Sequence, residues 1–293
     1  MKNYSIYIPV ILFLLIVSNT AFPDQNMLDI LNGLKLYISS FDNAGAILLS
    51  YDVVVEKPAL SENDAKKYAN ISMQEQLKRI FNDPDINSLK EETRSRAIRA
   101  FREGSLHSEK RNIQISKDSS MLDARTSNGD LLYEEKESGA IVEITDRSSN
   151  VLNHTGEEKR RTETRDKFGS LKYHFFFMNW CEFVKRSEVN KIERSLSNDN
   201  VNVLSYSHPD YKSYLHVKEI GTKYIPIKYI ISTPTYETIT TYENYDEVGG
   251  VLIPQTIIEE NLQTDKPSGL IAITGPYRIF YVLTKQAIIG SKF

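Results

Sequence analysis

The sequence predicts a mainly β protein of the α+β class, with one large curved antiparallel sheet, or incomplete barrel, whose concave face is covered by helices. Two observations predict the sheet: the C-terminal half is a series of runs rich in β-branched and aromatic residues, and short turns separate these runs. The third is an amphipathic helical pattern that precedes the first strand. Strand and helix patterns do not alternate along the chain, which disfavours a doubly wound α/β fold.

The N-terminus has the form of a secretory signal peptide. Lys2 precedes the 12-residue apolar run Ile6 to Val17, and small or polar residues follow up to Ala21. The run is shorter than the roughly 17–25 residues that span a bilayer. We therefore expect residues 1–21 to be cleaved, leaving 22–293 as one periplasmic or secreted domain without a transmembrane span. An uncleaved N-terminal anchor is the competing interpretation.

The next two elements are a helix and a strand that can pack on each other. Apolar residues spaced three and four apart predict a helix from Asn26 to Phe41 with a single apolar stripe. From Ala46 to Glu56, every second residue starting at Ile47 is apolar, which is the pattern of a strand with one buried face. We expect the apolar stripe of the helix to cover that face.

Residues 59–93 interrupt the strand pattern and predict a helical insertion. Ser72 and Glu75 have the spacing of a capping box, and apolar residues follow on one helical face. Two interpretations stay open: a lid or arm over a cavity, or a decoration packed on the outside. From Arg94 the sequence predicts strands again, at 94–102, 105–116, 131–135, 140–145 and 150–154, with a hairpin signal at Ser127-Asn-Gly-Asp130.

The middle of the chain is less regular, and the C-terminal third is the most strand-like part. The charged run 157–166 predicts an exposed loop, 175–184 fits either a buried helix or a strand, and 187–197 predicts a polar connector. Strands are then expected at 201–206, 213–218, 225–233, 236–245, 251–260 and 277–289. Because the turns between them are short, neighbouring strands must be antiparallel, and ten or more strands are expected in one curved sheet.

The clearest hairpin joins Tyr236–Tyr245 to Val251–Glu260. The loop between them, 246–250, ends in two glycines, which supply the positive φ angles that a tight reversal needs. Pro254 has no N–H to donate, so we expect it on an edge strand, at a strand start or at a bulge.

Composition and motifs argue against catalysis and against nucleic-acid binding. The net charge is −3, whereas a nucleic-acid surface calls for a basic stripe. Cys181 is the single cysteine, so no intramolecular disulfide can form. The five histidines have no metal-ligand spacing, and no nucleophile elbow, phosphate loop or dinucleotide fingerprint occurs. We expect no enzyme activity, no metal and no cofactor.

A large sheet covered on one side leaves apolar concave surface that needs a lid, a ligand or a partner. The candidates for a ligand-lining face come from two predicted strands: Ile47, Leu49, Tyr51, Val53, Ile227, Tyr229 and Ile231. The alternative interpretation is that these side chains form only the core beneath the helices.

Three stretches resemble the outer-membrane lipoprotein-carrier (LolA/LolB-like) superfamily. They are Ala44-Gly-Ala-Ile-Leu-Leu-Ser-Tyr-Asp-Val53, the pair Leu204-Ser-Tyr206 and Ile225-Pro-Ile-Lys-Tyr-Ile-Ile231, and Tyr242-Glu-Asn-Tyr-Asp-Glu-Val-Gly-Gly-Val-Leu-Ile-Pro254. The resemblance covers 25–56 and 94–289. It implies an incomplete antiparallel barrel, closed by helices, whose concave side receives acyl chains and which has no catalytic residues.

Two functional hypotheses follow from the sequence. The first is an exported soluble binding protein that shelters a lipid, an acyl chain or a lipoprotein in the half-barrel. The second is an envelope interaction or sensor module that binds a protein partner with the same sheet and the insertion at 59–93.

Overall fold

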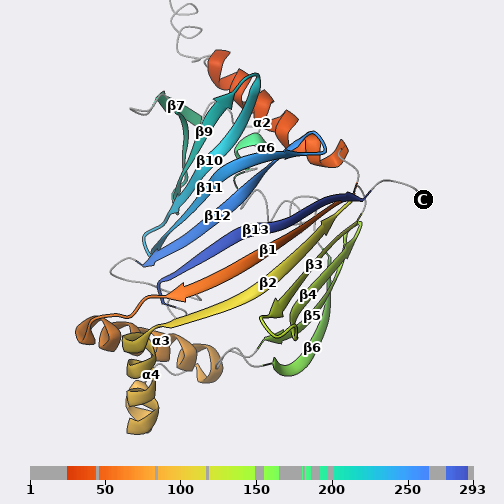
Figure 1. Cartoon of the computed structure of the whole chain (residues 1–293). Coiled ribbons are helices and arrows are strands. Elements are labelled where there is room, and N and C mark those ends of the chain that lie inside the picture. The colour runs from red at the N-terminus through yellow and green to blue at the C-terminus, as the bar shows by residue number, and fades with distance from the viewer. Residues whose placement is uncertain are drawn as a thin grey trace, which may run out of the picture.

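The computed structural model describes residues 25–43, 46–82, 85–116, 119–148, 155–164, 180, 182–185, 192–196, 201–263 and 275–289. Its strands form one 13-stranded sheet in which every neighbouring pair is antiparallel (Figure 1). The strands before the middle of the chain are β1 (Ala46–Lys57), β2 (Ser105–Ile115), β3 (Ser119–Thr126), β4 (Leu131–Ser138), β5 (Ile141–Ser148) and β6 (Thr155–Thr164). The fold class predicted from the sequence is confirmed.

The remaining strands build the other half of the sheet. They are β7 (Ile192–Leu196), β8 (Asn202–Ser207), β9 (Lys212–Ile220), β10 (Lys223–Ser232), β11 (Tyr236–Val248), β12 (Val251–Gln263) and β13 (Tyr277–Ile289). The order across the sheet is β6-β5-β4-β3-β2-β1-β13-β12-β11-β10-β9-β8-β7. Because the first strand pairs with the last, β1 and β13 lie side by side in the middle of the sheet, and β6 and β7 form the two edges within the described residues.

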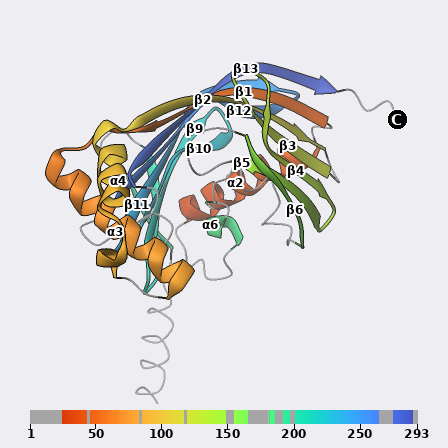
Figure 2. The same cartoon turned by 90° about the horizontal axis from the view of Figure 1, so that it is seen from below.

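One face of this sheet is concave and holds the main core. Figure 2 shows α2 (Gln25–Asn43) and the short α6 (Glu182–Lys185) beneath the arch of the sheet. Helix α2 packs mainly against β10, β12 and α6 and not, as was expected, mainly against β1. Its apolar stripe and the apolar face of β1 still belong to one core cluster. The predicted apolar stripe of α2 is buried along its whole length, at Met27, Ile30, Leu31, Leu34, Tyr37, Ile38 and Phe41. We call the face that α2 covers the inner face.

The hairpin of β11 and β12 closes with a two-residue turn. Val248 pairs with Val251, and the intervening Gly249 and Gly250 have φ angles of 60° and 83°. The turn is therefore shorter than the predicted loop at 246–250, while its need for glycine is confirmed. Pro254 pairs with Tyr245 of β11, whereas the pairing of β12 with β13 covers only Thr256–Asn261. Pro254 therefore lies outside the part of β12 that pairs with β13, so its missing N–H removes no hydrogen bond between these two strands.

The insertion between β1 and β2 is helical and longer than expected. It contains α3 (Glu62–Phe81), the 3-10 helix η1 (Ile86–Ser88) and α4 (Glu91–Glu103). We call α3, η1 and α4 together the arm. The cap of α3 is Ser61, whose hydroxyl accepts a bond from the Asp64 N–H, so the helix begins well before the capping-box spacing at Ser72.

The strand predicted at 94–102 is wrong, because these residues belong to α4. Acidic residues at the helix start and arginines one turn later form ion pairs: Arg94 with Glu91 at 2.8 Å and Arg96 with Glu92 at 3.0 Å. Such pairs support a helix even where the apolar pattern is short.

The charged run 157–166 was expected to be an exposed loop, but most of it belongs to strand β6. Its charges suit an edge strand, where they discourage pairing with other chains. The predicted connector at 187–197 contains the opposite edge strand, β7. The expected signal peptide, the strand at 150–154 and most of 175–184 lie outside the described residues.

Candidate binding site on the inner face

The centre of the inner face is built from the strand that the sequence singled out. Ile47, Leu49, Tyr51 and Val53 alternate along β1, and each has an exposed fraction of 0%. In β2, Ile113 lies opposite Leu49 and Ile115 lies opposite Ile47. In β13, Tyr281 lies opposite Val53. Antiparallel register therefore extends one apolar surface across three strands.

The candidates from β10 join the same surface. Tyr229 is 4% exposed, and Ile227 and Ile231 are partly buried against the same cluster as the β1 residues. The structure therefore brings all seven predicted residues together. Their role as a ligand lining stays a prediction, since in the arrangement described here they form the core under α2 and α6.

Aromatic rings join the helical cover to this core. Trp180, the single tryptophan of the chain, has no exposed surface and stacks on Tyr37 of α2 with ring centroids 6.3 Å apart. Phe183 of α6 meets the Tyr229 ring edge to face at 6.2 Å. Gly33 lets α2 approach β10, because a Cβ at this position would lie 2.3 Å from the Tyr224 ring. The helix is thus held closely against the sheet at one point of its length.

Tyrosine hydroxyls under α2 are satisfied by backbone carbonyls. Tyr37 donates to the Leu252 carbonyl at 2.9 Å, Tyr51 donates to the Pro254 carbonyl at 3.3 Å, and Tyr245 donates to the Pro226 carbonyl. Burial raises the pKa of each of the three phenols well above the usual range for tyrosine. These groups therefore stay neutral, and their rings act as apolar surface whose one polar atom has a partner.

The inner face becomes polar toward the C-terminal end of β1. Arg111 of β2 donates from Nε to the Glu109 carboxylate at 2.6 Å and from a terminal nitrogen to the Tyr281 hydroxyl at 3.1 Å. Burial opposes the charge on Arg111, but Tyr281 and Glu109 outweigh it and raise the pKa of the guanidinium. We did not predict this pair, although Glu109 and Arg111 continue the alternation of Ile113 and Ile115, and that pattern assigns them to the inner face.

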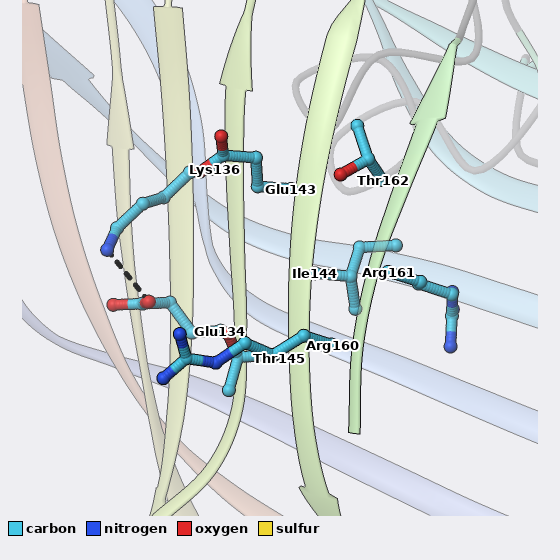
Figure 3. Close-up of a pocket in the computed structure, with 8 residues that line it drawn as sticks. All are labelled: Glu134, Lys136, Glu143, Ile144, Thr145, Arg160, Arg161 and Thr162. Atoms are coloured by element: carbon cyan, nitrogen blue, oxygen red, sulfur yellow. Dashed lines mark ion pairs between the residues drawn. The ribbon is translucent and has the colours of Figure 1, made fainter. Parts of the chain in front are cut away.

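A polar hollow of about 580 Å³ lies on β4, β5 and β6 (Figure 3). Its lining includes Glu134 and Lys136, which form an ion pair at 2.8 Å. These two residues alternate with the buried Glu135 and so point away from the inner face. Arg160, also in the lining, pairs with Glu158. Charges of both signs pair with each other here, as on a solvated outer surface.

The described residues offer no metal site, since none of their His, Cys, Asp and Glu side chains form a group of three or more suited to an ion. Burial lowers the pKa of His107 and of His216, which favours their neutral forms. None of the helices in the described part of the chain combines the length and apolar character needed to cross a bilayer.

Comparison with known proteins finds similarity only among solved structures. No family model and no curated protein matches the chain. The structural matches include a domain from Vibrio parahaemolyticus described as an outer membrane lipoprotein-sorting protein, at 9% identity, covering 89% of this chain and 92% of that one. They also include a LolA superfamily protein from Nitrosomonas europaea, at 12% identity with coverages of 87% and 93%. A DUF1329 family protein from Desulfovibrio piger matches at 7% identity with coverages of 89% and 93%. The TM-score is 0.39 in each case.

Proposed function

We propose that this chain is an exported binding protein that shelters an apolar ligand between the inner face and helix α2. The ligand class is a lipid, a free acyl chain or the acyl group of a lipoprotein. The observation that carries the proposal is a continuous apolar inner face whose described cover is one long helix and one short one, not a second sheet. We place the protein in the periplasm or outside the cell.

The contacts of α2 suit a cover that can be displaced. They are mainly apolar, and apolar contacts have no required direction, so an alkyl chain can replace them without leaving polar groups unpaired. One long-range polar contact of α2 is the hydrogen bond from Tyr37 to Leu252, and breaking this bond costs only about 1 kcal/mol if water then solvates both groups. Burying apolar ligand surface stabilises the complex by roughly 25 cal/mol per Å², which offsets the free energy lost when the helix contacts break.

The sheltered ligand requires no chemistry from the protein. Among the described residues, polar groups of the inner face bond to each other: tyrosine hydroxyls to carbonyls, Arg111 to Glu109, and Ser120 to Glu137. These bonds stabilise structure. The proposed role is therefore binding and transport without catalysis.

The test is to purify the exported protein from a bacterial periplasm and analyse an organic-solvent extract by lipid mass spectrometry, with native mass spectrometry of the intact protein. We expect a stoichiometric acyl-containing species that disappears from the native spectrum after extraction. A protein that is purified without lipid and takes up no fluorescent fatty acid would overturn the proposal.

A second candidate function is supported by the exposure of the arm. Helix α4 has no buried residue, and Phe81 at the end of α3 is 70% exposed. A projecting helix pair with an exposed aromatic ring suits a protein partner in the envelope. Loss of a cross-linked partner on deletion of the arm, with lipid uptake retained, would favour this function.

A further inference from the structure

A small cavity lies where the arm meets the end of the sheet, apart from the inner-face core. Figure 1 shows α3 and α4 at the ends of β1 and β2. The cavity has a volume of about 220 Å³, and we call it the junction pocket. Its lining comes from the end of β1 and the loop after it, from α3 and α4, and from the segment before β13, and it includes Lys57, Leu60, Ser72, Gln76, Ala97 and Phe101.

The apolar wall of the junction pocket is held in place before any ligand binds. The Leu60 N–H donates to the Phe101 carbonyl at 3.1 Å, which ties the start of the arm to α4. The Phe101 ring lies 6.4 Å from the Tyr68 ring on one side. On another side Gly275 approaches so closely that a Cβ there would be 2.5 Å from the Phe101 ring. Preformed walls reduce the entropy lost when a ligand binds.

The polar residues of the junction pocket are one lysine and two neutral side chains. Lys57 is an exposed residue at the rim of the pocket, no carboxylate of the described residues forms an ion pair with its ammonium, and partial desolvation lowers its pKa. On α3, Gln76 Nε2 donates to the Ser72 hydroxyl at 3.2 Å, which gives a neutral polar pair. The pocket therefore has one formal charge, a cation, beside an apolar wall.

We propose that the junction pocket binds a small amphipathic monocarboxylate, with its carboxylate at Lys57 and its alkyl chain against Leu60, Ala97 and Phe101. The charge of Lys57 selects an anion, and a pocket of this size, below the roughly 300–1,000 Å³ of drug-sized sites, selects a small one. Its volume equals that of about seven liquid water molecules, which corresponds to a carboxylate with a short alkyl chain. This site is separate from the inner face and does not depend on the proposed function.

The experiment is an NMR titration of the uniformly ¹⁵N-labelled protein, without its expected signal peptide, with hexanoate, hexan-1-ol and hexylamine. We expect saturable shifts of the amides around the pocket, including Ala97, Phe101 and Gly104, with hexanoate. The alcohol should bind at least about tenfold more weakly, since a charge-assisted hydrogen bond is lost. The amine should cause no saturable shift there, because its ammonium would face Lys57.

Two variants test the two halves of the pocket. Lys57→Gln removes the charge, and Ala97→Leu fills the apolar part with a good helix former. Each should weaken hexanoate binding at least about tenfold. Lys110→Gln, an exposed lysine on β2, is the matched control and should bind hexanoate like the parent protein.

Three outcomes would overturn the proposal. They are the absence of saturable shifts around the pocket, hexanoate binding unaffected by Lys57→Gln and Ala97→Leu, and shifts confined to inner-face residues such as Tyr229. The last result would leave the sheltered-ligand function standing while removing the junction pocket. Conversely, an inner face that takes up no acyl chain leaves the hexanoate result unchanged, so the two failures are distinguishable.

Discussion

Tyrosine is the residue that gives the inner face both its packing and its polar contacts. Tyr37 and Tyr51 are buried with their hydroxyls on carbonyls of β12 two hundred residues away in sequence. Tyr281 is also buried, and its hydroxyl accepts from Arg111. A tyrosine ring fills volume as a phenylalanine ring does, but its hydroxyl requires a partner, so each contact fixes a helix or strand in one position.

These phenols predict how stability depends on pH in alkali. Burial raises the pKa of Tyr281 to about 12 and that of Tyr37 and Tyr51 further, whereas an unfolded tyrosine titrates near 10. Above pH 10 the unfolded chain therefore binds fewer protons than the folded chain, so stability present below pH 10 is lost as pH rises. We expect tyrosinate absorbance to rise in two steps, the second together with loss of the circular dichroism signal.

The matched variant is Tyr51→Phe, which should reduce the slope of unfolding free energy against pH above 10. Titration of all the tyrosines in one step near pH 10, with the fold intact, would contradict the burial described for the inner face.

Individual inner-face residues could be predicted where the strand period is strict. Ile47, Leu49, Tyr51 and Val53 follow an alternation of two without interruption, and all four are buried. Glu109 and Arg111 follow the same rule but escaped prediction, because a charged residue suggests solvent unless its partner across the sheet is known. The Tyr281 hydroxyl, which accepts a hydrogen bond from Arg111, lies 170 residues away in sequence. Only the register of β1 with β2 and β13 brings the two residues together.

Helix α2 is the element on which the proposed binding depends. Its stripe was readable from spacing alone, but its position was not, because that depends on Gly33 meeting Tyr224 and on Tyr37 reaching β12. A helix held by an apolar stripe and a few polar contacts can separate from its sheet more readily than a strand, whose backbone bonds would all have to break.

A disulfide between α2 and β10 tests whether this separation is required. A Cβ built on Gly33 lies 3.1 Å from the Cβ of Tyr224, close to the roughly 3.5–4.5 Å of a disulfide. In a Cys181→Ser background, Gly33→Cys with Tyr224→Cys should take up a fluorescent fatty acid at least about tenfold less when oxidised, with recovery on reduction. Tyr224→Cys alone is the control, and equal uptake by the oxidised and reduced forms would contradict a displaceable α2.

The arm is anchored to the sheet by a glycine in a conformation open almost only to glycine. Gly104 has φ 65° and ψ −168°, and a Cβ there would lie 2.4 Å from the Lys57 carbonyl oxygen. Gly139 also has a positive φ, of 59°, but a Cβ there would meet nothing within 4 Å. Both positions have a positive φ, but of the two only Gly104 would also bring a Cβ into conflict with the backbone of β1.

We therefore expect Gly104→Ala to lower the unfolding free energy by roughly 2–4 kcal/mol and Gly139→Ala by roughly 1 kcal/mol, measured by urea denaturation. Equal losses at the two positions would show that the close approach of α4 to β1 is absent in solution.

Helices and strands whose apolar residues repeat with a strict helical or strand period were predicted well. Elements that depend on contacts with other parts of the chain were not. Strands β8 to β13 and helix α2 lie close to their expected ranges. Helix α4 was expected to be a strand, although Ala97, Ala100 and Phe101 have the three- and four-residue spacing of a helix. It packs on α3 and also forms ion pairs along its own surface. Strand β6 was expected to be a loop because all its side chains are polar, which its edge position permits.

Across the whole molecule, the arm is an addition to a sheet that is complete without it. Lys57 and Ser105 form the last pair of β1 and β2, so residues 58–104 leave the sheet and return to it at the same point. An Asn-Gly turn can join two antiparallel strands at such a pair.

Replacing residues 58–104 by Asn-Gly should therefore give a protein that keeps its circular dichroism spectrum and its fatty-acid uptake while losing the hexanoate site. Circular dichroism, uptake and NMR titration of the same sample measure the three properties. An unfolded product would show instead that the arm is part of the folding unit, and folded protein without uptake would make the arm part of the acyl site.

The central claim is that an acyl chain lies on the inner face beneath α2, and Trp180 reports on that position. As the single tryptophan, buried and stacked on Tyr37, it is a unique fluorophore at the proposed site. Bromine quenches tryptophan only at short range, so the measurement is Trp180 fluorescence during titration with dibromostearate and, in parallel, with stearate. The account predicts saturable quenching by the brominated chain at the concentration where stearate binds, and stearate binding without such quenching would contradict it.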